Sequence, residues 1–318
     1  MPGAGIVIRI FMTVGVALFS LALHATPAQA DEPLFGYVVT TDVVPKGKIE
    51  AEQWVTFREG RSQGSYHLLQ TRNELSYGLT NDLQISGYVN FARADVMGNA
   101  PDRSTSPPEV FADFQVDPAK RFKKSRFETV SAEAIWRIAS PYTKPVGLAI
   151  YVEPSIGSRT FEFETRLIAQ KNFIDDRLVF AANITYGIEV RRLPGEFGAV
   201  PGTPEAQKTT DHETDLNFGI AGSYRFAPRL SAGFELLNER EWAGFNAFRT
   251  SRATNVGYFL GPNFHFGGRH LFATTSLLFQ LKRAEDHDNP PPGFIVNGFS
   301  NADDFEKIRL RIKIGYNF

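Results

Sequence analysis

The last fifteen residues of the chain, 304–318, constrain its fold more than any other stretch. Every even-numbered position from Ile308 to Phe318 is apolar, whereas every odd-numbered position from Lys307 to Lys313 is cationic. A period of two residues is that of a β-strand whose two faces meet different surroundings. We therefore predict a C-terminal strand with one apolar and one cationic face. The cationic positions are Lys307, Arg309, Arg311 and Lys313.

Alternating segments of the same kind recur from Ile49 onward, with turn-forming residues between them. We count twelve candidate strands, at about 49–59, 65–77, 83–94, 125–139, 146–158, 161–171, 178–190, 214–226, 230–240, 253–264, 270–282 and 304–318. Connections after even-numbered strands are short, and those after odd-numbered strands include three loops of about twenty to thirty residues. This pattern is typical of bacterial outer-membrane barrels. We predict an all-β, closed antiparallel transmembrane barrel of about twelve strands, with short periplasmic turns and long extracellular loops.

The alternation also assigns a face to each side chain. Within each strand, the apolar residues lie at alternate positions and are expected to face lipid. Examples are Leu148, Leu167, Phe180, Phe218 and Phe279. A Lys or Arg facing lipid at mid-membrane costs about 2–4 kcal/mol. Charged residues fall on the other parity, which favours a membrane barrel over a soluble one. These lumen-facing candidates are Glu153, Glu162, Glu164, Arg166, Glu189, Arg225, Glu235, Glu239 and Lys282.

Composition supports this class and excludes others. The chain has 34 Lys and Arg against 35 Asp and Glu, and this balance argues against a nucleic-acid partner. It has no Cys, so it has neither disulfides nor Cys-ligated metal sites. The mean hydropathy of −0.21 fits a barrel because half of each spanning strand is polar.

The N-terminal region divides into three parts. Residues 1–30 carry an apolar run after Arg9 and end in Ala28-Gln29-Ala30, a pattern that predicts a secretory signal peptide. A retained membrane anchor is the alternative, but the run is shorter than the ~20 residues of a helical span. Residues 31–48 are expected to form a periplasmic strap, and whether they plug the barrel stays open. The barrel itself is expected at 49–318, in the outer membrane.

Several short motifs support a family resemblance. They are Glu52-Gln53-Trp54, Glu74-Leu75-Ser76-Tyr77-Gly78-Leu79-Thr80-Asn81, Val152-Glu153-Pro154-Ser155 and the terminal Phe318. Together they resemble a family of uncharacterised Gram-negative outer-membrane barrels, similar to those associated with the MetA pathway of phenol degradation. The resemblance implies a location and an architecture and names no substrate. A strand ending in Phe318 also resembles the signal read by the barrel-assembly machinery, which we expect as a partner beside outer-membrane lipid and lipopolysaccharide.

The cations of the C-terminal strand lead to two hypotheses about the lumen. In a closed barrel this strand pairs with the first strand, so Glu50 and Glu52 are its nearest expected partners. One hypothesis is an internal salt-bridge network that fills a narrow lumen. The other is a charge-separated channel that orients a small polar or anionic solute. Twelve strands lie between the eight that side chains fill and the sixteen of an open pore. The other lining candidates are Arg72, Glu74, Glu153, Glu162, Glu164 and Arg166.

Other features carry weaker expectations. Pro154 and Pro262 lie inside predicted strands, where a bulge or kink is expected. An alternative is that the kink at Pro154 aims Glu153 into a binding site. No His pair has zinc-like spacing, and neither His67 with Ser65 nor His265 with Asn263 has a nucleophile motif. We therefore expect no metal and no cofactor, and we place catalysis behind the other functions. The acidic residues Asp286, Asp288, Asp303 and Asp304 are expected to be solvated rather than to bind Ca²⁺.

These observations favour passage or binding of a small polar or anionic solute. Two alternatives remain: a non-transporting barrel that acts through its long loops, and a lipid-modifying enzyme of the outer membrane.

Overall fold

The structure is a computed structural model, and it describes residues 33–318 except 62, 246–252, 283–294, 297–298 and 301–304. The predicted signal peptide and the four acidic loop residues Asp286, Asp288, Asp303 and Asp304 lie outside the described residues. No helix in the described part of the chain is long and apolar enough to cross a membrane.

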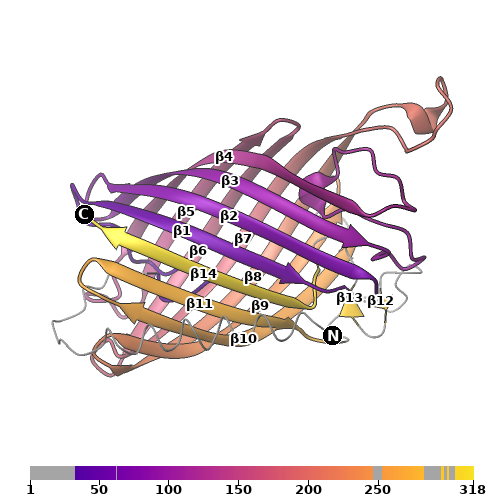
Figure 1. Cartoon of the computed structure of the whole chain (residues 1–318). Coiled ribbons are helices and arrows are strands. Elements are labelled where there is room, and N and C mark those ends of the chain that lie inside the picture. Colours follow the sequence, from indigo (N-terminus) through magenta and orange to yellow (C-terminus); the bar gives the residue numbers. More distant parts are fainter. Residues whose placement is uncertain (1–32, 62, 246–252, 283–294, 297–298, 301–304) are drawn as a thin grey trace.

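Twelve long antiparallel strands close into one barrel, as predicted (Figure 1). Each strand pairs with its neighbours in the sequence, and β14 closes the ring by pairing with both β11 and β1. The barrel strands are β1 (Ile49–Glu59), β2 (Ser65–Gly78), β3 (Leu83–Met97), β4 (Phe122–Ala139), β5 (Gly147–Gly157), β6 (Thr160–Phe173), β7 (Leu178–Leu193), β8 (Thr209–Ala227), β9 (Leu230–Ala243), β10 (Asn255–Gly267), β11 (Leu271–Gln280) and β14 (Ile308–Asn317). Two short strands, β12 (Ile295–Val296) and β13 (Phe299–Ser300), form a separate hairpin between β11 and β14.

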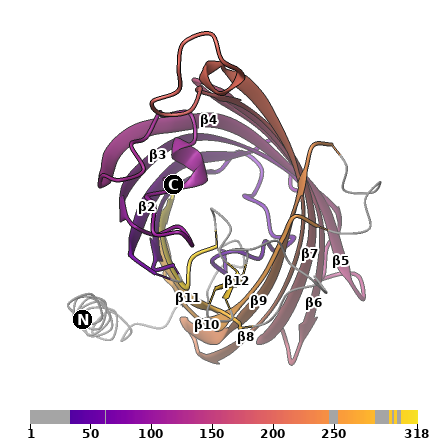
Figure 2. The same ribbon diagram turned by 90° about the vertical axis from the view of Figure 1, so that its right-hand side faces the viewer.

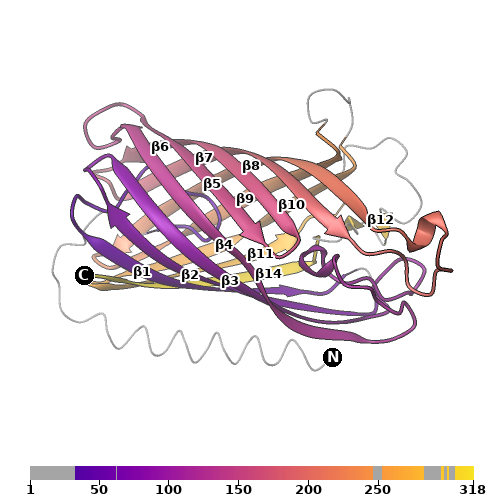
Figure 3. The ribbon, with the colours of Figure 1, turned by 90° about the horizontal axis from the view of Figure 1, so that it is seen from above.

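The two ends of the barrel differ, also as predicted (Figure 3). Short turns follow the second, fourth, sixth, eighth and tenth strands at what we call the short-turn end. The opposite, long-loop end carries two 3-10 turns, η1 (Glu109–Phe111) between β3 and β4 and η2 (Pro204–Ala206) between β7 and β8. At this end β3, β4, β7, β8 and β9 each extend three to five residues beyond the predicted limits. The loops are correspondingly shorter than the sequence suggested.

The outer wall is apolar, which confirms the predicted phase of the strands. Leu148, Leu167, Phe180, Phe218 and Phe279 are all exposed on it. On β14 the even-numbered residues Ile308, Ile314 and Tyr316 are exposed, as is Phe318 after it, whereas Leu310 is buried.

The expectation of a bulge at each in-strand proline is wrong. The pairs on either side of Pro154, Ser131 with Ser155 and Ala134 with Val152, keep one register. Pro lacks an N–H, so one hydrogen bond between the strands is missing there, but no residue is inserted. The strand pairs on either side of Pro262 also keep their register. Here Gly261 permits close approach, because a Cβ at this position would lie 1.8 Å from the Leu277 carbonyl oxygen.

Register shifts occur elsewhere. They lie between Val89 and Phe91, between Arg137 and Ala139, and between Arg225 and Ala227.

Candidate functional site

The segment that precedes β1 lies inside the barrel. We call residues 33–44 the strap; Figure 2 shows its indigo trace crossing the ring of strands. The carboxylate of Glu235, fully buried on β9, accepts backbone N–H groups from Gly36 (2.8 Å), Tyr37 (2.8 Å) and Val38 (2.9 Å). A buried backbone needs such partners, since unpaired N–H groups are costly. The strap therefore depends on a side chain of the wall for its conformation.

Amide side chains hold the rest of the strap. Asn183 on β7 accepts from the Val39 N–H at 2.6 Å and donates to the Val39 carbonyl oxygen at 2.8 Å. Gln170 on β6 accepts the Thr41 N–H at 2.8 Å, and Gln84 on β3 accepts the Val44 N–H at 2.8 Å. The open question about residues 31–48 is thus answered for the strap. It occupies part of the lumen instead of lying outside the barrel.

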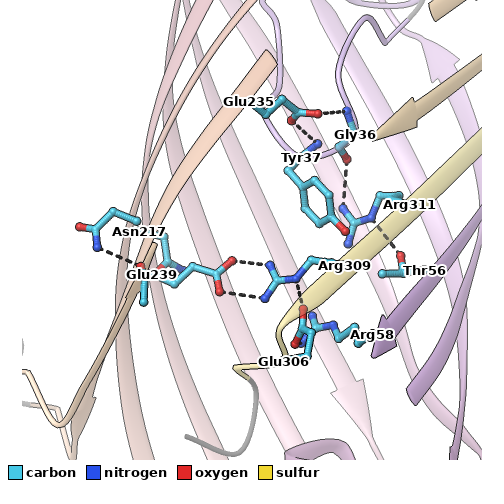
Figure 4. Close-up of polar contacts among 12 residues, drawn as sticks. Gly36, Tyr37, Thr56, Arg58, Asn217, Glu235, Glu239, Glu306, Arg309 and Arg311 are labelled. Atoms are coloured by element: carbon cyan, nitrogen blue, oxygen red, sulfur yellow. Dashed lines mark hydrogen bonds and ion pairs between the residues drawn. The ribbon is translucent and has the colours of Figure 1, made fainter. Parts of the chain in front are cut away.

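We call the four cations Lys307, Arg309, Arg311 and Lys313 the ladder. Arg309 is the ladder cation with carboxylate partners (Figure 4). It binds both oxygens of Glu239 on β9, at 2.6 and 3.0 Å, and its Nε donates to Glu306. Its guanidinium also lies over the Phe259 ring, 4.2 Å from the centroid. Arg58, opposite Arg309 in the strand pair, has a nitrogen 3.8 Å from Glu306. Arg309 thus links β14 to β9, three strands away around the ring.

Arg311 and Lys313 meet aromatic rings and the strap instead. Arg311 donates to Thr56 at 3.0 Å and to the Gly36 carbonyl at 3.1 Å, and lies 3.9 Å from the Tyr37 ring centroid. The buried Lys313 ammonium lies 3.8 Å from the centroid of the Trp54 ring. Cation–π contacts of this kind stabilise a desolvated cation by up to about 2 kcal/mol.

Lys307 precedes β14 and lies 4.9 Å from the centroid of the Phe299 ring. It therefore stands apart from the contacts of the other three ladder cations.

The expected ion pairs of the four cations with Glu50 and Glu52 are not formed, although Glu52 is the carboxylate whose charge acts most strongly on Lys313. Within the described residues none of the four ladder cations forms an ion pair with either carboxylate. The reason is register: Glu50 and Glu52 lie opposite Asn317 and Gly315, one rung or more toward the short-turn end from Lys313. Both are buried, and Glu52 accepts a hydrogen bond from the Trp54 indole N–H at 2.7 Å.

Arg72 and Glu153 form a second ion pair across the lumen, from β2 to β5, at 2.5 Å. Arg72 lies 3.6 Å from the Tyr88 ring centroid, and Glu153 also accepts from the Tyr151 hydroxyl. Glu153 therefore points into the lumen, as its place in the alternation predicted. The alternative that a kink at Pro154 aims it into a binding site stays a prediction.

Glu74 belongs to a neighbouring hydrogen-bonded group. It contacts the Ser76 hydroxyl at 2.7 Å and the Tyr88 hydroxyl at 2.9 Å. The Tyr88 hydroxyl also contacts Glu133. These contacts bring β2, β3 and β4 together on one side of the lumen.

The remaining predicted residues lie on β6. Glu164 pairs with Arg166 at 2.8 Å, and Arg166 also reaches the strap, donating to the Tyr37 carbonyl at 3.3 Å. Glu162 is half-buried between Ser155 and Glu189 in neighbouring strands. All twelve predicted site residues are accounted for, and eleven of them line the lumen.

A second segment enters the barrel from the long-loop end. We call residues 98–121 the mouth loop; in Figure 2, η1 lies within the ring of strands. Phe111 is fully buried against lumen-facing residues of β2–β4, among them Tyr66 and Leu68. Beside it, Glu109 forms an ion pair with Arg191 of β7. Nothing in the sequence indicated that this loop folds inward.

A cavity of about 470 Å³ lies between the strap and the mouth loop. Strap residues such as Tyr37 and mouth-loop residues such as Glu109 both line it. Its lining includes fifteen carboxylates and seven cationic side chains. The cations are Arg58, Arg72, Arg126, Arg166, Arg309, Arg311 and Lys313. The ladder thus contributes three cations to a site in which acidic groups predominate.

Three carboxylates lie close enough together to be considered as a metal site. Glu213, Asp215 and Glu241 offer oxygens within 4.8 Å of one another. Arg191 donates to Glu213 at 3.0 Å and Asn255 to Glu241 at 2.7 Å, so at least two of them have protein partners. We assign no ion to the group.

The two histidines considered for catalysis each contact a side chain other than the partner considered for them. His265 contacts the Thr274 hydroxyl at 2.8 Å, and His67 contacts Glu59.

Comparison with known proteins places the chain in a family. The sequence profile of the family of unknown function DUF6662 matches residues 27–318. The chain belongs to this family. The relation to MetA-pathway barrels stays a prediction, because the matching family carries no such description. No curated protein matches the chain at a significant level.

Solved structures show what the fold of this DUF6662 member is similar to. The COG4313 outer membrane channel from Pseudomonas putida F1 is similar with a TM-score of 0.51 and 10% identity, over 87% of this chain and 98% of that one. The NanC porin is similar with a TM-score of 0.47 and 10% identity, over 84% of this chain and 98% of that one. The translocator domain of the autotransporter NalP from Neisseria meningitidis is similar with a TM-score of 0.48 and 9% identity, over 99% of this chain and 96% of that one. The likeness to the COG4313 channel shows that the fold is that of an outer-membrane barrel.

Proposed function

We propose that this protein is an outer-membrane barrel that binds a small polar solute in its lumen and passes it between the strap and the mouth loop. The cavity of about 470 Å³ carries the proposal, because it lies at the centre of the barrel and is lined by charged side chains from its wall. Small-molecule sites commonly have volumes of about 300–1,000 Å³. The fold shared with an outer-membrane channel supports the location.

The charge of the lining favours a cationic or neutral solute over an anionic one. The sequence suggested a small polar or anionic solute because four cations alternate along residues 307–313. Arg309, however, is matched by Glu239 and Glu306, and the cavity lining has about twice as many carboxylates as cations. An acidic lining attracts cations and repels anions in a narrow pore.

Single-channel recording in planar bilayers tests passage. We expect the intact barrel to give small conductance steps, with a reversal potential in a KCl gradient that shows cation preference. Deletion of residues 33–44 should raise the step size severalfold, because the strap occupies part of the lumen. The absence of steps from both proteins would contradict passage and favour the non-transporting alternative.

A charge variant tests the preferred sign. We expect Asp215→Asn with Glu241→Gln to reduce the cation preference, since both side chains line the cavity. The matched control is Asp176→Asn, a carboxylate in the exposed β6–β7 turn. An unchanged reversal potential in the double variant would rule out the acidic lining as its cause.

A further inference from the structure

We propose that the outer wall over β3 and β4 binds a phosphate of lipopolysaccharide, with Arg93 as its principal ligand. This site lies on the face opposite the lumen and is independent of solute passage. Its starting observation is that Arg93 is exposed on the lipid-facing parity of β3, where a cation is otherwise disfavoured.

Among the described residues, Arg93 has no counter-ion. Within the described residues it has no hydrogen-bond, ion-pair or ring partner. Its neighbours in the two adjacent strands are Leu69 and Ser125, neither of which carries a charge. An arginine so placed offers its whole guanidinium fork to a ligand, and phosphate is a group that this fork binds in a bidentate manner.

The wall beside Arg93 is hollowed and apolar on the side toward the middle of the barrel. The next rung in that direction consists of Thr71, Phe91 and Phe127. The two Phe rings are exposed and pack edge to face, with their centroids 5.9 Å apart. A surface hollow of about 400 Å³ is lined by Leu69, Thr71, Phe91, Ala92, Arg93, Ser125, Arg126 and Phe127. Arg126 forms an ion pair with Asp113 and also lines the lumen cavity, so Arg93 is the cation of the hollow without a partner among the described residues. It lies beside the register shift between Val89 and Phe91. A hollow with an apolar floor below one cation fits a lipid with a phosphorylated headgroup.

The rung on the other side of Arg93 adds positive charge. There Lys123 and Arg121 share a single carboxylate, Asp95, and the side chains of both cations are more than half exposed. On β3, on β4 and at Arg121, three cations against Asp95 leave an excess of two positive charges. The same rung continues to His67 and Glu59 on β2 and β1, which contact each other. From the middle of the barrel toward the long-loop end, the wall therefore presents aromatic rings, then Arg93, then Arg121 and Lys123. In this order they would contact the acyl chains of the lipid, its first phosphate and its outer phosphates.

The position along the barrel selects the lipid. In bacterial barrels the long loops face the exterior, where lipopolysaccharide forms the outer leaflet. Arg93 lies four residues before the end of β3 at the long-loop end, at the level expected for headgroups of that leaflet. A cation near the interface costs only about 0–1 kcal/mol, so a bound phosphate suffices to compensate it.

Lipid retention by the full-length mature barrel tests the site. Purified protein in detergent is incubated with bisphosphorylated lipid A, with dephosphorylated lipid A or with phosphatidylglycerol, and bound lipid is counted by native mass spectrometry. We expect Arg93→Gln to weaken lipid A binding about tenfold, which corresponds to loss of about 1.4 kcal/mol. Arg93→Lys should recover part of it, because the charge remains without the fork. Wild-type protein should not retain dephosphorylated lipid A.

Arg192→Gln is the matched control. Arg192 is an exposed, outward-facing arginine near the long-loop end of β7, and its strand neighbour Thr210 is uncharged. It should bind lipid A as the wild type does. Equal binding by Arg93→Gln and wild type would overturn the proposal, as would equal retention of dephosphorylated lipid A. Phosphatidylglycerol retained as tightly as lipid A would overturn lipopolysaccharide as the occupant. Conductance of Arg93→Gln should equal that of wild type, so this test fails or succeeds separately from solute passage.

Discussion

The strap and the mouth loop both enter the barrel, but different forces hold them there. The strap presents its backbone to polar side chains of the wall, with Glu235 binding three successive N–H groups. The mouth loop inserts the ring of Phe111 into an apolar pocket and adds charged contacts, including Arg191 with Glu109. One segment is thus held mainly by buried hydrogen bonds, and the other by apolar burial and ion pairs.

This difference teaches that the two segments should respond to different changes. Hydrogen bonds to a buried carboxylate are shielded from salt, whereas partly exposed ion pairs are screened by it. Apolar burial is lost when a ring is truncated, whatever the ionic strength. Variants that release one segment without the other would support the comparison.

The largest effect is expected for Glu235→Ala. Hydrogen bonds to charged groups each contribute about 1.5–3 kcal/mol, and this variant removes three. Because the chain has no Cys, Val38→Cys gives a single thiol in the strap whose maleimide labelling reports its release. We expect labelling to accelerate at least about a hundredfold. Asn183→Ala, which removes two neutral bonds to Val39, should accelerate it less. Equal labelling in all three proteins would mean that Glu235 does not hold the strap.

Phe111→Ala should release the mouth loop. Truncation of a buried Phe costs about 3–5 kcal/mol, and here the loss falls on docking of the loop. Trypsin should then cleave faster at Lys120 and Arg121, which are exposed in this loop. Phe197→Ala is the control, because Phe197 is 52% exposed in the loop between β7 and β8. Cleavage at the wild-type rate would show that the ring does not anchor the loop.

Arg191→Gln should loosen the mouth loop by a smaller amount. It leaves Glu109, Glu189 and Glu213 without their shared cation. We expect about 1–3 kcal/mol of destabilisation, seen as a moderate rise in tryptic cleavage. Labelling of the Val38→Cys strap should stay unchanged. A rise in strap labelling would mean that the two segments are coupled.

Salt should have the smallest effect. Raising the ionic strength from 0.1 to 1 M shortens the Debye length from about 10 to 3 Å. We expect the mouth loop of the wild type to loosen by less than about 1 kcal/mol, because partly exposed pairs contribute little. Strap labelling should not respond, since Glu235 is fully buried. A strap more sensitive to salt than the mouth loop would reverse the comparison.

Much of the wall could be predicted from the sequence. Alternation between lipid and lumen is a local property of each strand, so residues such as Leu167 and Glu164 were assigned to their faces without knowledge of strand partners. Turn residues and loop lengths likewise gave the strand order, because antiparallel neighbours follow one another along the chain. Errors at the strand ends arose where β3, β4, β7, β8 and β9 continue past the predicted limits.

The interior depended on tertiary structure. Parity alone placed Arg309 in the lumen, but its pairing with Glu239 rests on the closure of the barrel, which brings β14 and β9 into reach across the interior. The register of β1 against β14 decided that Glu50 and Glu52 lie beyond the ladder, and a pattern of period two contains no register.

The sequence by itself therefore determined the barrel, its two ends and the polarity of each face, because these follow from local alternation and turns. Tertiary structure alone decided that the strap and the mouth loop fold inward. Both segments lack an alternating pattern, and their positions depend on hydrogen-bonding and apolar groups contributed by distant strands. Contacts such as Gly36 with Glu235, 199 residues apart, exist only once the ring has closed.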